Sequence, residues 1–111
     1  MVDKPGYYRG RHFTGWVEAI KELKRAGRLD DAIELLGGLV EATEAEARVD
    51  SNGVAPWYYE QLAIIHRKRR DLAQEVAILQ RYADQRHAPG QVPQQMAARL
   101  RKARELLRKA E

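Results

Sequence analysis

The residues best suited to chemistry lie together in the middle of the chain, in the stretch Ala55–Asp71, which reads APWYYEQLAIIHRKRRD. Three aromatic residues stand near its start, and a histidine followed by four consecutive cations stands near its end. Aromatic rings stack on nucleic-acid bases and cations hold phosphates, so one interpretation is a nucleic-acid grip. A second is a ligand pocket, and a third is one helix of a packed scaffold. The choice depends on where a helix would place each side chain.

A helix through this stretch does not present its aromatic residues as one platform. Consecutive helical residues point about 100° apart, so Trp57, Tyr58 and Tyr59 face different directions. We expect Tyr59 to lie in the core and at least one of the other two to be partly exposed. The basic run falls at the C-terminal end of this helix, where cations interact favourably with the helix dipole, and it covers more than a full turn. A one-sided phosphate-binding stripe is therefore disfavoured.

The sequence offers no arrangement typical of catalysis or of metal binding. His12, His66 and His87 lack the spacing of metal-ligand pairs, and there is no phosphate-binding loop or nucleophile elbow. The acidic residues within 41–50 stand at steps that suit surface ion pairs with Arg48, and a metal-dependent hydrolase would need a second acidic cluster. We therefore expect no catalytic residue, no metal site and no cofactor, and we expect His66 to be a core histidine.

Length and charge narrow the class of partner. At 111 residues without cysteine, the chain forms one domain with neither disulfides nor thiolate metal sites. Residues 1–55 hold eight Lys/Arg against ten Asp/Glu, whereas residues 56–111 hold twelve against six, so the second half carries the whole positive excess. Such asymmetry is typical of proteins that bind an anionic partner, and equally of basic residues that cover solvated helix faces. No apolar leader segment opens the chain and no run is long enough to span a bilayer, so we expect a cytoplasmic protein without membrane contact.

The elements that must position these residues are helices. Sustained apolar–polar alternation is absent, and the residue types that favour helices dominate. Thr14 is the expected cap of the first helix and Gly27 its stop, and Pro56 fits the first turn of the third helix. The expected helices cover residues of about 13–26, 29–48, 56–69, 72–86 and 93–110. The prediction is an all-α fold with an N-terminal arm (1–12), two antiparallel helical hairpins (about 13–49 and 55–87) and a C-terminal capping helix.

The arm contains an unusual segment, Tyr7–His12, which pairs aromatic rings with cations. Two roles are open for this segment. It can fold back on the first hairpin, with the tyrosines covering apolar surface, or it can offer its arginines to a partner.

The two hairpins repeat each other, with Trp16 aligned on Tyr59 and Gly27 on Arg70. An aromatic residue, small and apolar residues, a short turn and a second apolar helix form a pattern that resembles the tetratricopeptide repeat. The second copy departs from the family at Arg70 and Glu75, where glycine and a small residue are usual. The best match is WVEAIKELKRAGRLDDAIELL, in which the family's spacings are met by Trp16, Gly27, Leu29, Ala32 and Leu36. The chain also looks like a group of small bacterial helical-repeat proteins, with YRGRHFT before the first hairpin and VAPWYYEQLA opening the second.

The resemblance implies a concave, peptide-binding face lined by the first helix of each hairpin. This face would be basic with an aromatic and aliphatic patch, which suits an acidic peptide or chain terminus. The predicted function is therefore non-catalytic protein–protein interaction, as a module or adaptor. Carried over residue by residue, the partner-binding positions are Lys21, Lys24, Arg25, Trp57, Glu60, Ile64, Arg67 and Lys68.

The rival prediction is a nucleic-acid-associated accessory protein that uses the basic second half of the chain. Two hairpins also bury little apolar surface for a solenoid, in which about three repeats are normally needed. We therefore expect self-association, or docking on a partner or an attached domain. In the rival, Arg67, Lys68 and Arg70 would join the cations of the last helix, which are Arg99, Arg101, Lys102, Arg104, Arg108 and Lys109.

Overall fold

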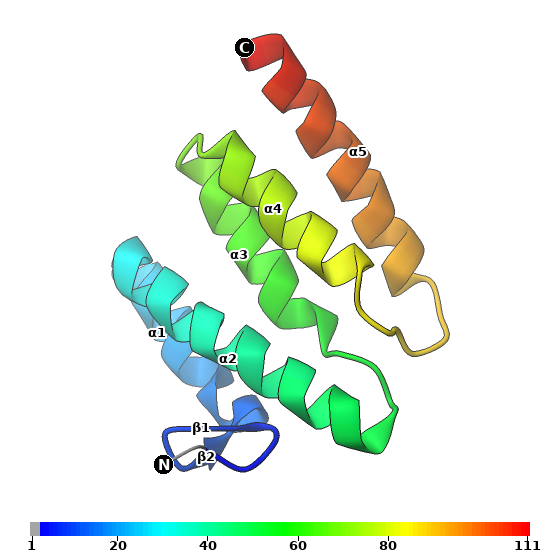
Figure 1. Cartoon of the computed structure of the whole chain (residues 1–111). Coiled ribbons are helices and arrows are strands. Elements are labelled where there is room, and N and C mark those ends of the chain that lie inside the picture. The colour runs from blue at the N-terminus through cyan, green and yellow to red at the C-terminus, as the bar shows by residue number, and fades with distance from the viewer. Residues whose placement is uncertain (1–2) are drawn as a thin grey trace.

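The computed structural model describes residues 3–111, and its architecture is helical (Figure 1). Within these residues, five α-helices pack in chain order as antiparallel neighbours, so the predicted all-α fold of two hairpins and a fifth helix is confirmed. The elements are the strands β1 (Tyr7–Tyr8) and β2 (Arg11–His12), the 3-10 helix η1 (Phe13–Trp16), and the helices α1 (Val17–Arg25), α2 (Leu29–Asp50), α3 (Pro56–Lys68), α4 (Leu72–Ala83) and α5 (Val92–Ala110).

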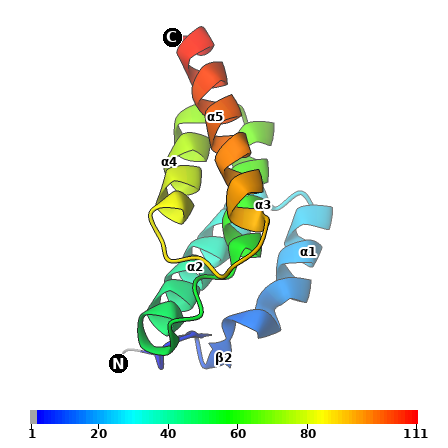
Figure 2. The same ribbon diagram turned by 90° about the vertical axis from the view of Figure 1, so that its right-hand side faces the viewer.

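The first helices of the two hairpins share one side of the molecule. Figure 2 shows α1 and α3 on one side and α2 and α4 on the other. Helix α5 packs antiparallel on α4 and therefore runs in the same direction as α3. It occupies the place that the first helix of a third hairpin would take. The described chain is longest along one axis, with extents of 42 × 34 × 24 Å, because the helices are stacked in one direction.

The core lies between the hairpins and is centred on α2, α3 and α4. Tyr59, predicted to be a core residue, is fully buried between them. The apolar spacing of α2 predicts a buried face of Ala32, Leu35, Leu36, Leu39 and Val40, and all of these are buried except Leu35, which is half-buried. On α5 the spacing predicts Met96, Leu100, Ala103 and Leu107, and all are buried except Leu107, which is half-buried. The other fully buried apolar side chains of largest volume are Ile20, Leu36, Leu39, Ile65, Leu79 and Val40.

Both hairpins turn through the same hydrogen-bonded motif. At the end of α1, Gly27 N–H donates to the Lys24 carbonyl (3.1 Å) and Arg28 N–H donates to the Leu23 carbonyl (2.9 Å). Gly27 has φ of +71°, the left-handed conformation that this helix end requires, so it is the predicted stop. The corresponding turn after α3 is made by Arg70, whose φ is +61°.

The turn at Arg70 matches the first bond for bond. Arg70 N–H donates to the Arg67 carbonyl (3.0 Å), and Asp71 N–H donates to the His66 carbonyl (2.8 Å). The structure therefore supports the alignment of Gly27 with Arg70, and the second hairpin uses a residue with a side chain where the first uses glycine.

Two predicted helix ends differ from the structure. Thr14 is not the cap of the first helix: His12 precedes η1, and its Nδ1 accepts a hydrogen bond from Thr14 N–H (3.3 Å). Helix α4 ends at Ala83, three residues before the predicted end at Arg86. The reason is tertiary, because the Arg86 carbonyl accepts a hydrogen bond from Val54 N–H (3.2 Å) in the loop before α3.

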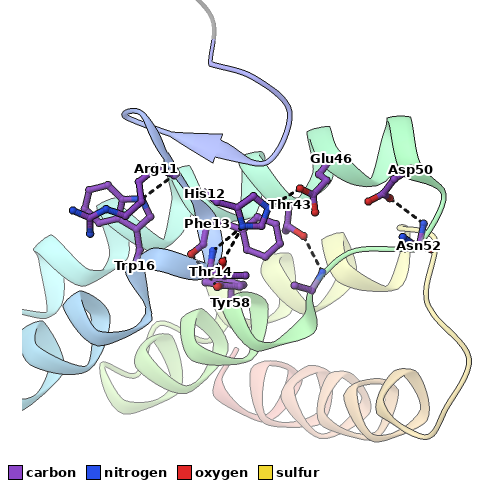
Figure 3. Close-up of polar contacts among 11 residues, drawn as sticks. Arg11, His12, Phe13, Thr14, Trp16, Thr43, Glu46, Asp50, Asn52 and Tyr58 are labelled. Carbon is purple, nitrogen blue, oxygen red and sulfur yellow. Dashed lines mark hydrogen bonds and ion pairs between the residues drawn. The ribbon is translucent and has the colours of Figure 1, made fainter.

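The Tyr7–His12 segment folds back on the first hairpin as a two-stranded antiparallel ribbon, in which Tyr7 pairs with His12. The strands were not predicted, since two residues each are too short to show an alternating pattern. Figure 3 shows how side chains attach the ribbon to the helices. His12 Nε2 lies 2.6 Å from Glu46 Oε2 on α2, and Trp16 Nε1 donates to the Arg11 carbonyl (3.4 Å). The same Trp16 Nε1 also lies within hydrogen-bond distance of the Tyr8 carbonyl (3.2 Å). The Phe13 carbonyl that follows the ribbon accepts a hydrogen bond from Tyr58 Oη of α3 (3.0 Å).

The glycine pair inside α2 has a structural reason. The Tyr8 ring packs directly on Gly38, where a Cβ would lie 2.2 Å from Tyr8 Cε1. The other glycine, Gly37, has nothing within 4 Å of its Cβ position. Gly38 is therefore needed for the approach of the N-terminal ribbon, not for a helix crossing or a kink.

Candidate interaction face

The side formed by α1, α3 and α5 is here called the first-helix face, and the eight predicted partner-binding residues all lie on two of its helices, α1 and α3. Helix α1 contributes three of them and α3 contributes five. The structure adds α5, which runs alongside α3 and forms a seam with it. Glu60 and Arg99 form an ion pair across this seam, with Glu60 Oε2 and Arg99 Nε 3.5 Å apart. A shallow pocket lies toward each end of the seam.

The pocket at the N-terminal end of the seam has a volume of about 230 Å³. Trp57 borders it and is half-buried, whereas Tyr58 and Tyr59 are buried. This confirms that Tyr59 is a core residue and that at least one of Trp57 and Tyr58 is partly exposed. The Trp57 ring stands edge-on to Tyr58, with ring centroids 5.0 Å apart. Val92 of α5, across the pocket, has 40% of its surface exposed. The complete lining is Pro56, Trp57, Glu60, Val92, Gln95 and Met96.

The pocket at the C-terminal end of the seam is larger, about 360 Å³. It combines apolar side chains from α4 and α5 with cations from the end of α3 and from α5. Its lining is Arg67, Arg70, Leu72, Leu106, Lys109 and Ala110.

Arg67 is held in place by a buried carboxylate. Its Nε donates to both carboxylate oxygens of Glu75, at 2.7 and 2.9 Å, and the Glu75 side chain is only 1% exposed. The hydrogen bond to Glu75 favours the charged guanidinium and raises the pKa of Arg67. A partner would therefore meet a cation that is already paired. In the sequence, the signal that could have revealed the pair was Glu75 itself, an acidic residue where the resemblance to the tetratricopeptide repeat predicted a small one.

Two more predicted residues are engaged with neighbouring helices. The Lys24 ammonium donates to Oε1 of the buried Gln61, which connects α1 to α3. Glu60 is paired with Arg99, as described above. Together with Arg67, three of the eight predicted side chains therefore make contacts between helices. Their polar groups are already partly occupied by these contacts and are less available to a partner.

The remaining predicted residues are available at the surface. Lys21 and Arg25 are exposed and pair with glutamates three residues earlier on α1, contacts that contribute only a few tenths of a kcal/mol. Ile64 is half-buried and Lys68 is exposed. Within residues 3–111, Lys68 has no ion pair closer than 4.0 Å.

Sequence reasoning missed the α5 side of the face. It treated the last helix as a cap and assigned no partner-binding residue to it, yet five residues of α5 line the pockets without having been considered for binding. The row of apolar residues along α5 was the signal in the sequence that could have identified it as a further first helix, since it repeats the direction and position of one. The missed residues are Val92, Gln95, Met96, Leu106 and Ala110, whereas Lys109 and Arg70 were considered only for nucleic acid.

Buried polar groups in the interior are paired within the fold or desolvated. Glu44 accepts hydrogen bonds from Tyr59 Oη and from Arg81 Nε, each at 2.8 Å. Burial alone would raise the pKa of Glu44, but the hydrogen bonds from Arg81 and Tyr59 outweigh it and lower the pKa. His66 is buried as predicted, and this desolvation lowers its pKa. These groups stabilise the interior rather than present a reactive site.

Across residues 3–111, no three or more His, Cys, Asp or Glu side chains are grouped so as to hold a metal ion. Over the same range, none of the helices is both long enough and apolar enough to cross a membrane. No family model, curated protein or solved structure matches the chain.

Proposed function

We propose that the protein is a non-catalytic protein–protein interaction module that holds a segment of a partner on its first-helix face. The observation that carries the proposal is the α3–α5 seam, where half-buried Trp57 and exposed Val92 border a pocket that, among residues 3–111, is lined by α3 and α5 alone. Aromatic and aliphatic side chains in a pocket with a polar rim are typical anchor points of protein interfaces. The resemblance to the tetratricopeptide repeat supports the same function, since that family binds peptides on the equivalent face.

The charge of the face favours an acidic partner. Lys21, Arg25 and Lys68 are exposed along α1 and α3, and Arg70 extends the same charge beyond the end of α3. Complementary charge accelerates association and orients the partner, while the apolar anchors contribute most of the affinity.

Removal of the aromatic anchor tests the proposal. In a pull-down from cell lysate analysed by mass spectrometry, Trp57→Ala should lose the partners recovered by the wild-type protein. With a purified partner, its affinity should fall about 30-fold, the effect of an interface anchor. Val49→Ala is the matched control, because Val49 is 69% exposed at the end of α2, away from the face. Unchanged recovery with a folded Trp57→Ala variant would exclude the pocket at Trp57 as the binding site.

A second candidate function, nucleic-acid association, is favoured by the exposed cations on the outer side of α5. Arg101, Lys102 and Arg108 are all exposed there. Phosphate binding should weaken steeply as salt rises, with a slope set by the number of contacts, whereas peptide docking at Trp57 should respond much less. If neither a duplex nor a single strand binds at low salt, this candidate fails.

A further inference from the structure

Arg70 adopts a strained conformation in the structure. The turns after α1 and α3 make the same two hydrogen bonds, yet the first has Gly27 at the left-handed position and the second has Arg70, with φ of +61°. A Cβ makes this conformation unfavourable, so glycine would suit the second turn better. The two backbone hydrogen bonds hold the turn, but in residues 3–111 no hydrogen bond or ion pair involves the Arg70 side chain, so the fold makes no polar use of the guanidinium. Arg9 and Ser51 also have positive φ, but neither stands at a turn for which the first hairpin supplies a glycine counterpart. Strained residues of this kind cluster at functional positions.

Beside Arg70 lies the larger pocket of the first-helix face. Its apolar part comes from Leu72, Leu106 and Ala110, of which the two leucines are half-buried. Arg67 and Lys109 also line it, each already paired with a carboxylate, Glu75 at 2.7 Å and Glu105 at 3.0 Å. Arg70 is therefore the cation of this pocket whose charge the chain leaves unbalanced.

The combination of an apolar floor and cations at the rim specifies the chemistry of a ligand. Leu72 and Leu106 would cover an aliphatic side chain, and the planar guanidinium of Arg70 would bind a carboxylate through two parallel hydrogen bonds. A nucleic acid fits less well, because base recognition on a single strand needs aromatic stacking and no aromatic residue lines this pocket.

We infer that this pocket binds an acidic peptide segment of a partner, with an aliphatic side chain on Leu72 and Leu106 and a flanking carboxylate on Arg70. The inference rests on the proposed function and deepens it, since it names the chemistry of the partner and the end of the face that recognises it. The strained turn holds the Arg70 side chain at the rim of the pocket before the peptide arrives.

A defined peptide tests the inference directly. The probe is a short fluorescent peptide of aspartate and glutamate residues around one central leucine, measured by anisotropy against the full chain. It should bind with a saturable isotherm, and replacement of its leucine by alanine should weaken binding about tenfold. In a two-dimensional NMR titration, the resonances that shift most should belong to Arg70, Leu72 and Leu106. No binding at millimolar peptide, or shifts confined to other elements, would overturn the inference.

The Arg70→Gly variant separates recognition from folding. It should weaken peptide binding about tenfold, as expected for loss of a charge-assisted hydrogen bond, while it raises Tm by about 4 °C because the strain is removed. A merely structural role for Arg70 predicts the opposite, a lower Tm. Arg101→Ala, which removes an equal charge from the exposed side of α5, should change the affinity less than twofold.

The outcomes also separate this inference from the proposed function. If Trp57→Ala abolishes partner recovery but Arg70→Gly and Leu106→Ala leave peptide affinity unchanged, the first-helix face binds partners and the acidic-peptide pocket is wrong. If Arg70→Gly weakens peptide binding while Trp57→Ala leaves partner recovery unchanged, the pocket stands and the seam at Trp57 is wrong. If a single-stranded oligonucleotide displaces the peptide at physiological salt and binds more tightly, the site is a nucleic-acid site and the inference fails.

Discussion

At the scale of single residues, the Arg67–Glu75 pair shows how the face is both built and charged. Glu75 is almost completely buried, and its two oxygens receive hydrogen bonds from a guanidinium that is 39% exposed. A buried carboxylate without a partner is costly, so Arg67 is a structural residue as well as a lining residue of the face. The sequence places Arg67 on the first helix of the second hairpin and Glu75 on the second helix of that hairpin. Only the packing of α3 on α4 brings the two side chains together.

We predict that Arg67→Ala lowers the free energy of unfolding by about 2 kcal/mol, less than for a fully buried pair because the guanidinium is partly solvated. Urea unfolding followed by circular dichroism measures this change. The double variant Arg67→Met with Glu75→Leu should recover most of the loss, since apolar residues of similar size replace a buried pair at little cost. A loss below about 0.5 kcal/mol in the single variant would show that water reaches Glu75.

At the scale of elements, the N-terminal ribbon and α2 depend on each other. The ribbon contributes Tyr8, and α2 contributes the glycine surface on which that ring lies. Within the ribbon, the Asp3 carboxylate accepts hydrogen bonds from the N–H groups of Arg9 and Gly10, at 3.1 and 3.3 Å, which fixes the tight turn between β1 and β2. The helices were predictable from composition and stop signals, whereas the ribbon was not, because it is stabilised by long-range contacts rather than by a local pattern.

The two adjacent glycines of α2 provide a matched test of this dependence. Gly38→Ala should lower the free energy of unfolding by about 1–3 kcal/mol, because its Cβ meets the Tyr8 ring and displaces the ribbon. Gly37→Ala should instead raise it by up to about 1 kcal/mol, since its Cβ meets open space and alanine favours the helix. Thermal unfolding of both variants measures the difference. Equal effects at the two positions would mean that the ribbon does not rest on α2.

At the scale of the whole molecule, the chain is a short stack with ends that a longer array would cover. Its radius of gyration is 14.1 Å, against about 13 Å for a compact domain of this length. Trp16, Leu23 and Leu35 at the α1–α2 end are only partly buried, and they border a shallow pocket of about 220 Å³. A further hairpin, a second copy or a partner would bury these side chains.

We predict that the purified chain self-associates. Its weight-average mass in sedimentation equilibrium should rise between micromolar and millimolar concentration, because association covers the apolar end of the stack. Leu35→Glu should suppress the rise, while Val49→Ala, an exposed change elsewhere on α2, should not. A stable monomer over the whole concentration range would contradict self-association. A partner protein or an attached domain would then be expected to cover the apolar end of the stack.

Local pattern determined the helical class, the five helices, the stop at Gly27 and the burial of Tyr59, because helix propensity, turn chemistry and apolar spacing act within a few residues. Tertiary structure decided what the face presents. The packing of the helices placed α5 beside α3 and paired Arg67 with the buried Glu75. It also brought Leu106 into one pocket with Leu72 and Arg70. These contacts join residues from different helices, and their geometry depends on how the helices cross. The side chains on α1 and α3 could therefore be predicted from the sequence, whereas the fold determined which of them remain available to a partner.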